Sequence, residues 1–427
     1  MTPSRVAGLP RSRRRAAPRR AALLAFLAVM GPGIITGFAG NDAGGVTTYT
    51  AIGAHHGFAL LWLLLLSTAG LVVIQGMCAR MGAVTGKGLS DLIRERFGVR
   101  WTIVAMLALL VANGINVVAE YAGIAVSLAL LGVPPALSVP VAGAVVWALI
   151  VFFSYRVVER ALFVLVLAFV AYPLSAAIVD PDWAAVGRGF AIPSLPAEPS
   201  ALLAALALVG TTITPYMQFY IQASVVDKGI DIRQYRYARL DVLLGALLTG
   251  VNAFFIVVVA GAVLFPAGVE VRSAADAAGA LGPLAGGAAQ LLFGVGLFGA
   301  SMLAATVMPL STAYAVCEAF GWESGISKNF GEAPVFMGLV TALLVVGGLI
   351  VVLFPPGLLV ELILVSQAVN GLLLPVVLVF ILRLATDRAL MGDAANGRVA
   401  TAVGWGIAGL ASALSVGYVV LTVLGIA

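Results

Sequence analysis

Apolar runs of about 18 residues or more recur along the whole chain, and they restrict its fold more than any other feature. A run of that length crosses the hydrocarbon core of a bilayer as a helix, and inside the bilayer the backbone polar groups must be satisfied internally. Only 10% of the residues are charged, whereas soluble domains carry about 25%. The sequence therefore predicts an all-α polytopic membrane protein.

Charged or Pro/Gly-rich breaks divide the apolar runs into eleven candidate membrane spans, preceded by a basic tail at 1–21. The expected spans are 22–50, 58–80, 101–131, 136–156, 160–179, 200–226, 240–265, 284–317, 334–354, 357–384 and 399–425.

The positions of lysine and arginine predict the orientation of these spans. With the N-terminus in the cytoplasm, all of the 24 Lys and Arg residues except Arg188 and Arg272 fall in the tail, in cytoplasmic loops or at cytoplasmic ends of spans. Cytoplasmic loops of membrane proteins carry such an excess. We therefore expect a multi-pass protein of the inner (plasma) membrane with an extracytoplasmic C-terminus. The arginine-rich tail is interpreted as a membrane anchor and not as a nucleic-acid-binding segment.

A polar stretch, NDAGGVTT, interrupts the first span and places Asp42 among glycines. An ionisable side chain at the bilayer centre costs about 2.5–3.5 kcal/mol on insertion scales, so Asp42 is a candidate functional residue. The neighbouring Gly44 and Gly45 weaken the helix and free backbone carbonyls for a ligand.

The sixth span is interrupted at a matching place, where Thr211 and Thr214 precede Pro215. Proline removes a backbone N–H and clashes with the preceding turn, which breaks or kinks a helix. Because five spans separate the two interruptions, we expect two repeats of opposite orientation, 22–179 and 200–384, followed by 399–425. Paired interrupted helices in matching halves are typical of a midplane site in a secondary transporter. The alternative is that Pro215 only kinks the span for packing.

Few other polar side chains are expected inside the membrane. Asn113, Asn116 and Glu120 share one face of the third span, Asn252 lies in the seventh span and Gln367 in the tenth. For the amides the alternative to a site role is an interhelical hydrogen bond, which contributes about 0.6 kcal/mol in membranes. The carboxylate of Glu120 must be protonated, paired or in contact with water.

Several stretches of the chain resemble the Nramp family (natural resistance-associated macrophage proteins): GPGIITGFAGNDAGG, GAHHGFALLWLLLL, TGKGLSDLIRERFG, VAEYAG and TTITPYMQFYIQ. The resemblance extends over spans one to ten. It implies the LeuT-like fold, with two inverted five-helix repeats, broken helices 1 and 6, and a metal site between them. It also implies a membrane transporter and not an enzyme, with the metal ion as substrate and no cofactor. The oligomeric state is left open, a monomer included.

The chain departs from the family pattern at two ligand positions. Members that transport manganese and iron carry Asp-Pro-Gly-Asn in helix 1; here Asp42 keeps the carboxylate, but Gly45 stands in place of the asparagine. They carry Met-Pro-His in helix 6; here Thr214 and Tyr216 replace the methionine and the histidine. Oxygen ligands suit Mg²⁺, which also keeps several waters. This pattern resembles the prokaryotic Nramp-related magnesium transporters, which take Mg²⁺ and also Mn²⁺.

Proton coupling is also expected to be altered. Proton-coupled members are similar around Glu120, but they have an aspartate where this chain has Val117 and a histidine where it has Tyr216. They also carry an arginine pair near the start of helix 9, where this chain has none. Tyrosine is a poor proton carrier at neutral pH, so uncoupled transport is predicted.

The predicted function is alternating-access import of a largely hydrated Mg²⁺, with Mn²⁺ as a second substrate. The residues expected around the metal are Asp42, Thr211, Thr214 and Gly45, and those expected to line the pathway are Asn252, Gln367, Tyr216 and Glu120. The nearest alternative is a proton-coupled Mn²⁺/Fe²⁺ importer of the Nramp type. An organic-solute carrier fits the midplane carboxylate less well, and a membrane-embedded enzyme needs clustered catalytic groups that the spans do not offer.

Overall fold

The computed structural model describes residues 29–196, 198–269, 271, 274–354 and 356–423, together with Phe26. Within the helices, the side chains at 356–369 and at a few other positions are not among those described. The basic tail 1–21 and most of 22–28 lie outside the described residues, so the expectations for them stay predictions.

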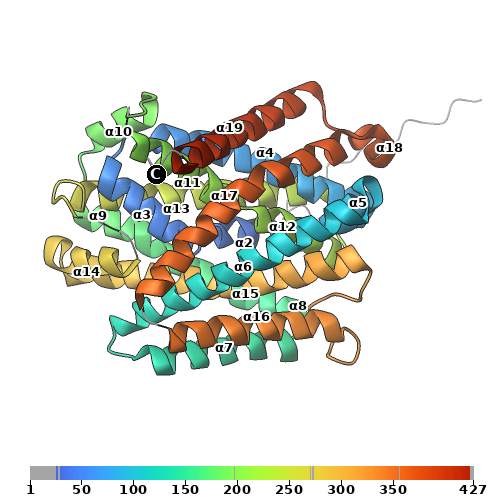
Figure 1. The fold of residues 1–427 in the computed structure, drawn as a ribbon, viewed down its shortest axis with the longest axis horizontal. Helices are drawn as coiled ribbons and strands as arrows, with labels where there is room; N and C mark the ends of the chain where they lie inside the picture. Colours follow the sequence, from blue (N-terminus) through green and yellow to red (C-terminus); the bar gives the residue numbers. More distant parts are fainter. Residues whose placement is uncertain are drawn as a thin grey trace, which may run out of the picture.

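Helices packed side by side form the described part of the chain (Figure 1). Nine of its helices or helix pairs are long and apolar enough to cross a membrane. They are α4 (Leu61–Thr85), α6 (Val99–Ala129), α7 (Pro135–Phe152), α8 to α9 (Tyr155–Val166, η1 Leu167–Val170, Ala171–Val179), α11 to α12 (Pro199–Thr212, Pro215–Asp227), α13 (Tyr235–Val263), α15 (Gly287–Phe320), α16 (Pro334–Leu353) and α19 (Arg398–Val423).

Two further elements correspond to expected spans but are not among these nine. The first is the interrupted pair α2 (Pro32–Ala39) and α3 (Ala43–His56), and the second is α17 (Pro356–Thr386). The architecture is therefore the all-α membrane bundle that the sequence predicts, whereas the count of eleven spans stays a prediction.

Both predicted helix breaks are present. The first span is interrupted between Ala39 and Ala43, and the sixth is interrupted at Ile213 and Thr214, immediately before Pro215 begins α12. One detail is a correction: Gly44, expected within the first break, is the second residue of α3. The helix resumes earlier because an aspartate precedes it, and aspartate is a favoured N-cap.

Helix α13 packs closely along both halves of the broken first span. A Cβ atom on Gly33 of α2 would lie 2.4 Å from the backbone nitrogen of Val242, and one on Gly53 of α3 would lie 2.5 Å from the backbone oxygen of Val257. Such backbone approach requires glycine, as is common between membrane helices. One continuous helix therefore supports the two halves on either side of the break.

Short helices cap the two ends of the bundle (Figure 1). The expected amphipathic helix between the second and third spans is α5 (Leu89–Phe97), which lies at the same end as α18 (Arg388–Met391) and η2 (Gly392–Ala394). At the other end, α10 (Trp183–Ala191) and α14 (Ala274–Ala285) occupy stretches that were expected to be loops. Both are too short to cross a membrane, which is why a search for apolar runs passed over them.

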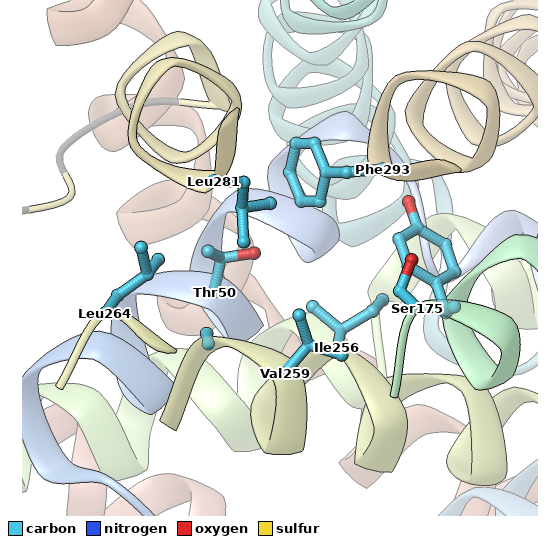
Figure 2. Close-up of a pocket in the computed structure, with 9 residues that line it drawn as sticks. Thr50, Ser175, Ile256, Val259, Leu264, Leu281 and Phe293 are labelled. Atoms are coloured by element: carbon cyan, nitrogen blue, oxygen red, sulfur yellow. The ribbon is translucent and has the colours of Figure 1, made fainter. Parts of the chain in front are cut away.

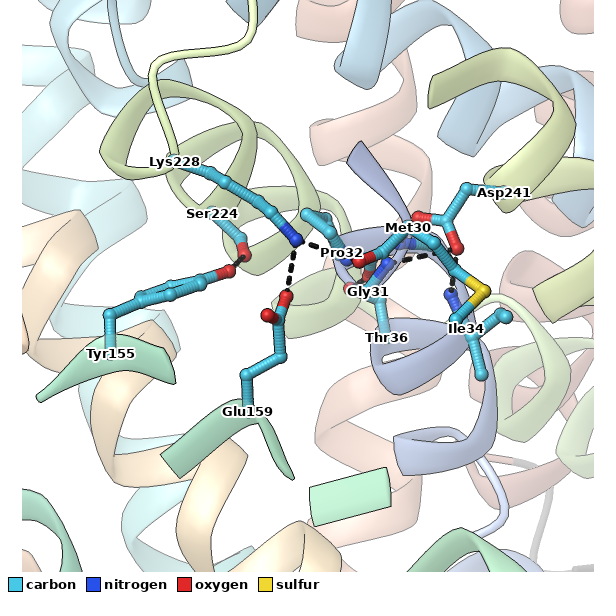
Figure 3. Close-up of polar contacts among 11 residues, drawn as sticks. Met30, Gly31, Pro32, Ile34, Thr36, Tyr155, Glu159, Ser224, Lys228 and Asp241 are labelled. Carbon is cyan, nitrogen blue, oxygen red and sulfur yellow. Dashed lines mark hydrogen bonds and ion pairs between the residues drawn. The ribbon is translucent and has the colours of Figure 1, made fainter. Parts of the chain in front are cut away.

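The N-terminus of α2 is held by a carboxylate of α13. Asp241 accepts hydrogen bonds from the backbone N–H groups of Gly31 at 3.1 Å, Gly33 at 2.6 Å and Ile34 at 3.4 Å (Figure 3). The first N–H groups of a helix have no partner within it, and a negative charge there is stabilised by the helix dipole. Asp241 therefore fixes the end of α2 to α13.

A partly buried ion pair joins the same end of α2 to two other helices. Lys228, which follows α12, lies 2.6 Å from the carboxylate of Glu159 on α8 and donates to the backbone oxygen of Met30 at 2.7 Å (Figure 3). The hydroxyls of Tyr155 and Ser224 are 2.9 Å apart beside it. Three helices other than α2 therefore position its N-terminus.

We predict that Asp241→Asn loosens this end of α2, because it removes the charge and leaves one acceptor for three donors. The expected loss of stability is about 1–2 kcal/mol, measured as a lower melting temperature of the purified protein. A cysteine introduced at Met30 should also react faster with a water-soluble thiol reagent, since the native Cys78 and Cys317 are buried. Asp231→Asn, which changes an exposed turn, is the control. If Asp231→Asn lowered the melting temperature and raised the thiol reactivity as much as Asp241→Asn, Asp241 would not be what holds the N-terminus of α2.

Candidate metal site

Asp42 lies in the first helix break and is 1% exposed. It is the N-cap residue of α3, and its Oδ1 accepts a hydrogen bond from the backbone N–H of Gly45 at 2.5 Å. A capping aspartate satisfies one of the free N–H groups at a helix start. The same side chain therefore restarts the helix and is held in a fixed position at the break.

Glu120 of α6 binds the same helix start. Its Oε2 accepts from the backbone N–H of Ala43 at 3.0 Å, while its Oε1 has no hydrogen-bond partner. Two buried carboxylates, those of Asp42 and Glu120, thus meet the N-terminus of α3. The positive end of the helix dipole favours negative charge at this place. The expected place of Glu120 beside the ion path stays a prediction.

Tyr216 of α12 spans the gap between the two broken helices. Its hydroxyl lies 2.5 Å from the backbone oxygen of Ala39 and 3.5 Å from Oδ2 of Asp42. A tyrosine hydroxyl has a single proton to donate, and the shorter contact takes it. Ser311 of α15 donates to the backbone oxygen of Tyr216 at 2.8 Å and holds this turn in place. The Oδ2 atom of Asp42 consequently remains available to an ion or to one of its waters.

The two predicted threonines lie on either side of the second break with their hydroxyls free. Thr211 is in the last turn of α11 and Thr214 is the N-cap residue of α12; both are buried, and neither hydroxyl has a partner. Threonine at an N-cap usually bonds to the helix it precedes, but Thr214 makes no such bond. Thr212, by contrast, is committed to the backbone oxygen of Leu208 and the hydroxyl of Tyr49.

Gly45 allows the two broken helices to approach each other. A Cβ atom on Gly45 would lie 3.2 Å from both Oδ1 of Asp42 and Oγ1 of Thr211, and 2.9 Å from the backbone oxygen of Gly40. Asp42 and Thr211 therefore face the same point beside Gly45. Gly45 therefore contributes to the site by its lack of a side chain and by its backbone N–H, which holds Asp42.

Two further residues, Asn41 and Met217, lie at the first break and were not among the predicted site residues. The side chain of Asn41 donates to the backbone oxygen of Thr249 at 3.0 Å, and its Oδ1 is left without a partner. The Sδ atom of Met217 lies 2.8 Å from the point where a Cβ would stand on Gly40. Both were within the interrupted stretches, and their polar or thioether groups were the available signal.

The remaining predicted pathway residues are less closely tied to the break. Asn252 of α13 donates to the backbone oxygen of Leu248 at 3.0 Å, and its Oδ1 has no partner. Gln367 is in α17, but its side chain lies outside what the structure describes. The role of each residue stays a prediction.

The amides of the third span make interhelical hydrogen bonds, as the alternative interpretation supposed. Asn113 donates to the hydroxyl of Thr312 on α15 at 2.8 Å. Asn370 of α17 donates to Oδ1 of Asn116 at 3.3 Å. These contacts fasten α6 to its neighbours beside Glu120.

The candidate site is closed to solvent in this structure. Asp42, Thr211, Thr214 and Tyr216 are each at most 1% exposed. A small cavity with room for about one water lies farther along α3, beside Thr50 and the unpartnered hydroxyls of Tyr172 and Ser175 (Figure 2). None of the predicted site residues lines that cavity.

The groups at the two breaks suit a hard cation. Among the described residues, no three or more His, Cys, Asp or Glu side chains gather to hold a metal ion. The free side-chain oxygens instead belong to Asp42, Asn41, Glu120, Thr211 and Thr214. The C-terminal ends of α2 and α11 add carbonyls without helical partners, which is how broken membrane helices coordinate cations.

Comparison with known proteins decides the family. The family model described as natural resistance-associated macrophage protein-like (Nramp) matches residues 33–421. The chain belongs to the Nramp family. The divalent metal cation transporter MntH of Ralstonia nicotianae is 30% identical over 414 residues, which cover 89% of this chain and 88% of that protein.

Solved structures confirm the fold expected from the resemblance. A manganese transporter of Eremococcus coleocola superposes with a TM-score of 0.79 at 22% identity, covering 94% of this chain and 87% of that one. Mhp1, a nucleobase-cation-symport-1 family transporter, gives a TM-score of 0.55 at 17% identity over 92% of this chain and 91% of its own. The Nramp chain thus has the LeuT-like fold with inverted repeats and broken helices 1 and 6. It is a multi-pass membrane transporter and not an enzyme, and in its family the metal is substrate and not cofactor.

We predict that Gly45→Ala impairs transport more than folding. The added methyl group would press on the backbone oxygen of Gly40 and separate Asp42 from Thr211. Crowding of this kind costs about 1–3 kcal/mol, and we expect metal uptake in proteoliposomes to fall at least about tenfold. Gly76→Ala, where a Cβ would meet nothing within 4 Å, is the matched control. Unchanged uptake by Gly45→Ala would refute the close approach at this site.

Proposed function

We propose that this Nramp family member is an alternating-access importer of divalent metal ions, with Mg²⁺ as its main substrate and Mn²⁺ as the second. The names of its relatives support a divalent cation as cargo. The observation that carries the choice of Mg²⁺ is the donor set at the breaks: Asp42 with an available oxygen, and Thr211 and Thr214 with unpartnered hydroxyls. Hydroxyl, carbonyl and carboxylate oxygens suit Mg²⁺ and Mn²⁺ better than softer metals.

The proposed substrate keeps most of its water shell. Mg²⁺ dehydrates reluctantly and is usually bound through one or two carboxylates and several waters. Asp42 supplies the essential charge, and the hydroxyls of Thr211 and Thr214 contact the ion or its waters. Gly45 leaves space that the asparagine of other family members would fill. Asn252, Gln367 and Tyr216 complete the lining in some conformations.

Transport would follow from movement of the two repeats, 22–179 and 200–384, around the breaks. We place the N-terminus, α5 and α18 in the cytoplasm of a cell with this protein in its inner (plasma) membrane, and the C-terminus outside. The excess of lysine and arginine at that end supports this orientation. Opening toward the cytoplasm then requires release of the contacts of Asp241 and Lys228 with α2.

We further propose that metal transport is not coupled to protons. A proton relay needs titratable groups in sequence, and the third span has Val117 and two amides around Glu120. Glu120 is engaged at the start of α3. Its carboxyl group therefore serves to hold the start of α3 in place.

A proton-coupled Mn²⁺/Fe²⁺ importer is the second candidate, and one observation favours it. The thioether of Met217 lies beside Gly40 at the first break, where it could offer a soft ligand from a position not aligned with the family methionine. The similar protein of Ralstonia nicotianae is named a divalent metal cation transporter, and that name does not separate the two candidates.

We predict that Asp42→Asn abolishes Mg²⁺ uptake in proteoliposomes while the protein remains folded. Asparagine caps a helix about as well as aspartate, so α3 keeps its start while the site loses its charge. The expected loss is at least about a hundredfold, because several kcal/mol of charge attraction disappear from a buried site. Asp393→Asn on the exposed surface is the control. Near-normal uptake by a correctly inserted Asp42→Asn protein would refute the site.

We predict that Mg²⁺ and Mn²⁺ enter without acidification of the liposome interior. Internal pH should be recorded together with uptake, with Ca²⁺ and Fe²⁺ as competitors. The variant Met217→Leu nearly conserves side-chain volume, so Mg²⁺ uptake should change by less than about twofold. Acidification that follows metal uptake, or loss of tight Fe²⁺ competition in Met217→Leu, would instead support the second candidate.

A further inference from the structure

A cavity of about 290 Å³ lies between α4, α13 and α19, at the end of the molecule that we place in the cytoplasm. Its walls combine apolar side chains with two arginines and one tyrosine, and they are Val72, Val73, Gly76, Met77, Arg80, Tyr235, Arg239, Val242, Leu243 and Ala400. No part of the proposed ion path uses these residues. The cavity is therefore a second, separate site.

The charge of this cavity is positive and largely uncompensated. Arg80 donates from Nη2 to the side chain of Asn396, but its Nε is buried without a partner. Arg239 is exposed, and no ion pair to it occurs within the described part of the chain. No carboxylate lines the cavity. The nearest acidic residue along α13, Asp241, is occupied by the N-terminus of α2.

An apolar groove continues from this cavity along the same two helices. A space of about 510 Å³ lies between α4, α13 and α10, and apart from Thr68 its side chains are apolar or aromatic. Leu243 lines the first space, whereas Leu247 and Val251 line the second. Residues four apart lie on one helix face, so the two spaces follow one another along the exposed face of α13.

The cavity and the near end of the groove fit within one leaflet of a bilayer. From Arg239 to Leu247 the rise along α13 is about 12 Å at 1.5 Å per residue. Half of a bilayer including its headgroups measures about 20–22 Å. The basic end would therefore stand at headgroup depth, and the near end of the groove at Leu247 would lie within the same leaflet. The far end of the groove, beside α10, lies toward the opposite end of the bundle.

We propose that this surface binds one anionic phospholipid of the cytoplasmic leaflet. Its phosphate lies between Arg80 and Arg239, with the hydroxyl-bearing Tyr235 beside them, and one acyl chain follows the groove past Leu247. Basic pockets between membrane helices on the cytoplasmic side are suited to such headgroups. The inference rests on the proposed orientation of the chain but not on the choice of transported metal.

Native mass spectrometry of the purified full-length protein tests the proposal. The protein is titrated with phosphatidylglycerol and with phosphatidylcholine of the same acyl chains. We expect one phosphatidylglycerol to be retained in preference to phosphatidylcholine, and we expect Arg80→Gln and Arg239→Gln each to weaken its binding about fivefold. Arg233→Gln, an exposed arginine of the preceding loop that does not line the cavity, is the matched control. Melting curves confirm that the variants are folded, and the exposed Arg239 keeps the test valid if Arg80→Gln is unstable.

Two further experiments test whether the bound phosphate belongs to a lipid and whether the groove holds its acyl chain. Inorganic phosphate and glycerol phosphate should not displace the bound lipid at equal concentration, and Leu247→Trp should weaken lipid binding while both arginines remain. Displacement by the soluble phosphates would overturn the lipid as occupant. Equal binding of the two lipids, or an Arg233→Gln effect as large as that of Arg239→Gln, would overturn the site itself.

Discussion

The start of α3 in the middle of the bundle is the feature on which the rest of the structure depends. A helix that begins at bilayer depth exposes N–H groups where no water can satisfy them, and each would cost several kcal/mol if unpaired. Asp42 and Glu120 supply the acceptors. The helix start in turn makes two buried carboxylates tolerable. The helix start therefore needs the two carboxyl groups as hydrogen-bond acceptors, and the carboxyl groups need its N–H groups as donors. A bound cation would stabilise the carboxylate further.

The surrounding helices hold the two halves of the first span in position. Glycines at Gly33 and Gly53 bring α13 against both halves of the first span, and Asp241 fixes the far end of α2. Met217, Tyr216 and Ser311 fill the space between the two breaks. Because the backbones of these helices are in direct contact at the glycines, they can move little relative to each other. A displacement at the N-terminal end of α2 is therefore transmitted to the site at its C-terminal end.

The sequence allowed the bundle, both breaks and the central carboxylate to be predicted, because each depends on local chemistry. Apolar length predicts a span, and Asp42 or Pro215 within one predicts an interruption. The partners of these residues could not be predicted in the same way. Glu120 at the start of α3, and the bond from Tyr216 to Ala39, join residues far apart in the chain. The short helices α10 and α14 were missed because they lack the length that identifies a span. Thr211 was predicted from the sequence, and the structure adds that its hydroxyl has no partner whereas that of Thr212 is hydrogen-bonded.

The hydroxyl of Tyr216 has one proton and two oxygens within reach, the carbonyl of Ala39 and the carboxylate of Asp42. A cation that draws the carbonyl at the end of α2 toward itself removes the first acceptor, and the proton can then turn to the second. The tie between α2 and α12 would weaken in the same step. In the proposed function, arrival of the substrate and release of α2 would then be two results of one rearranged hydrogen bond, which would link occupation of the site to movement of the helix.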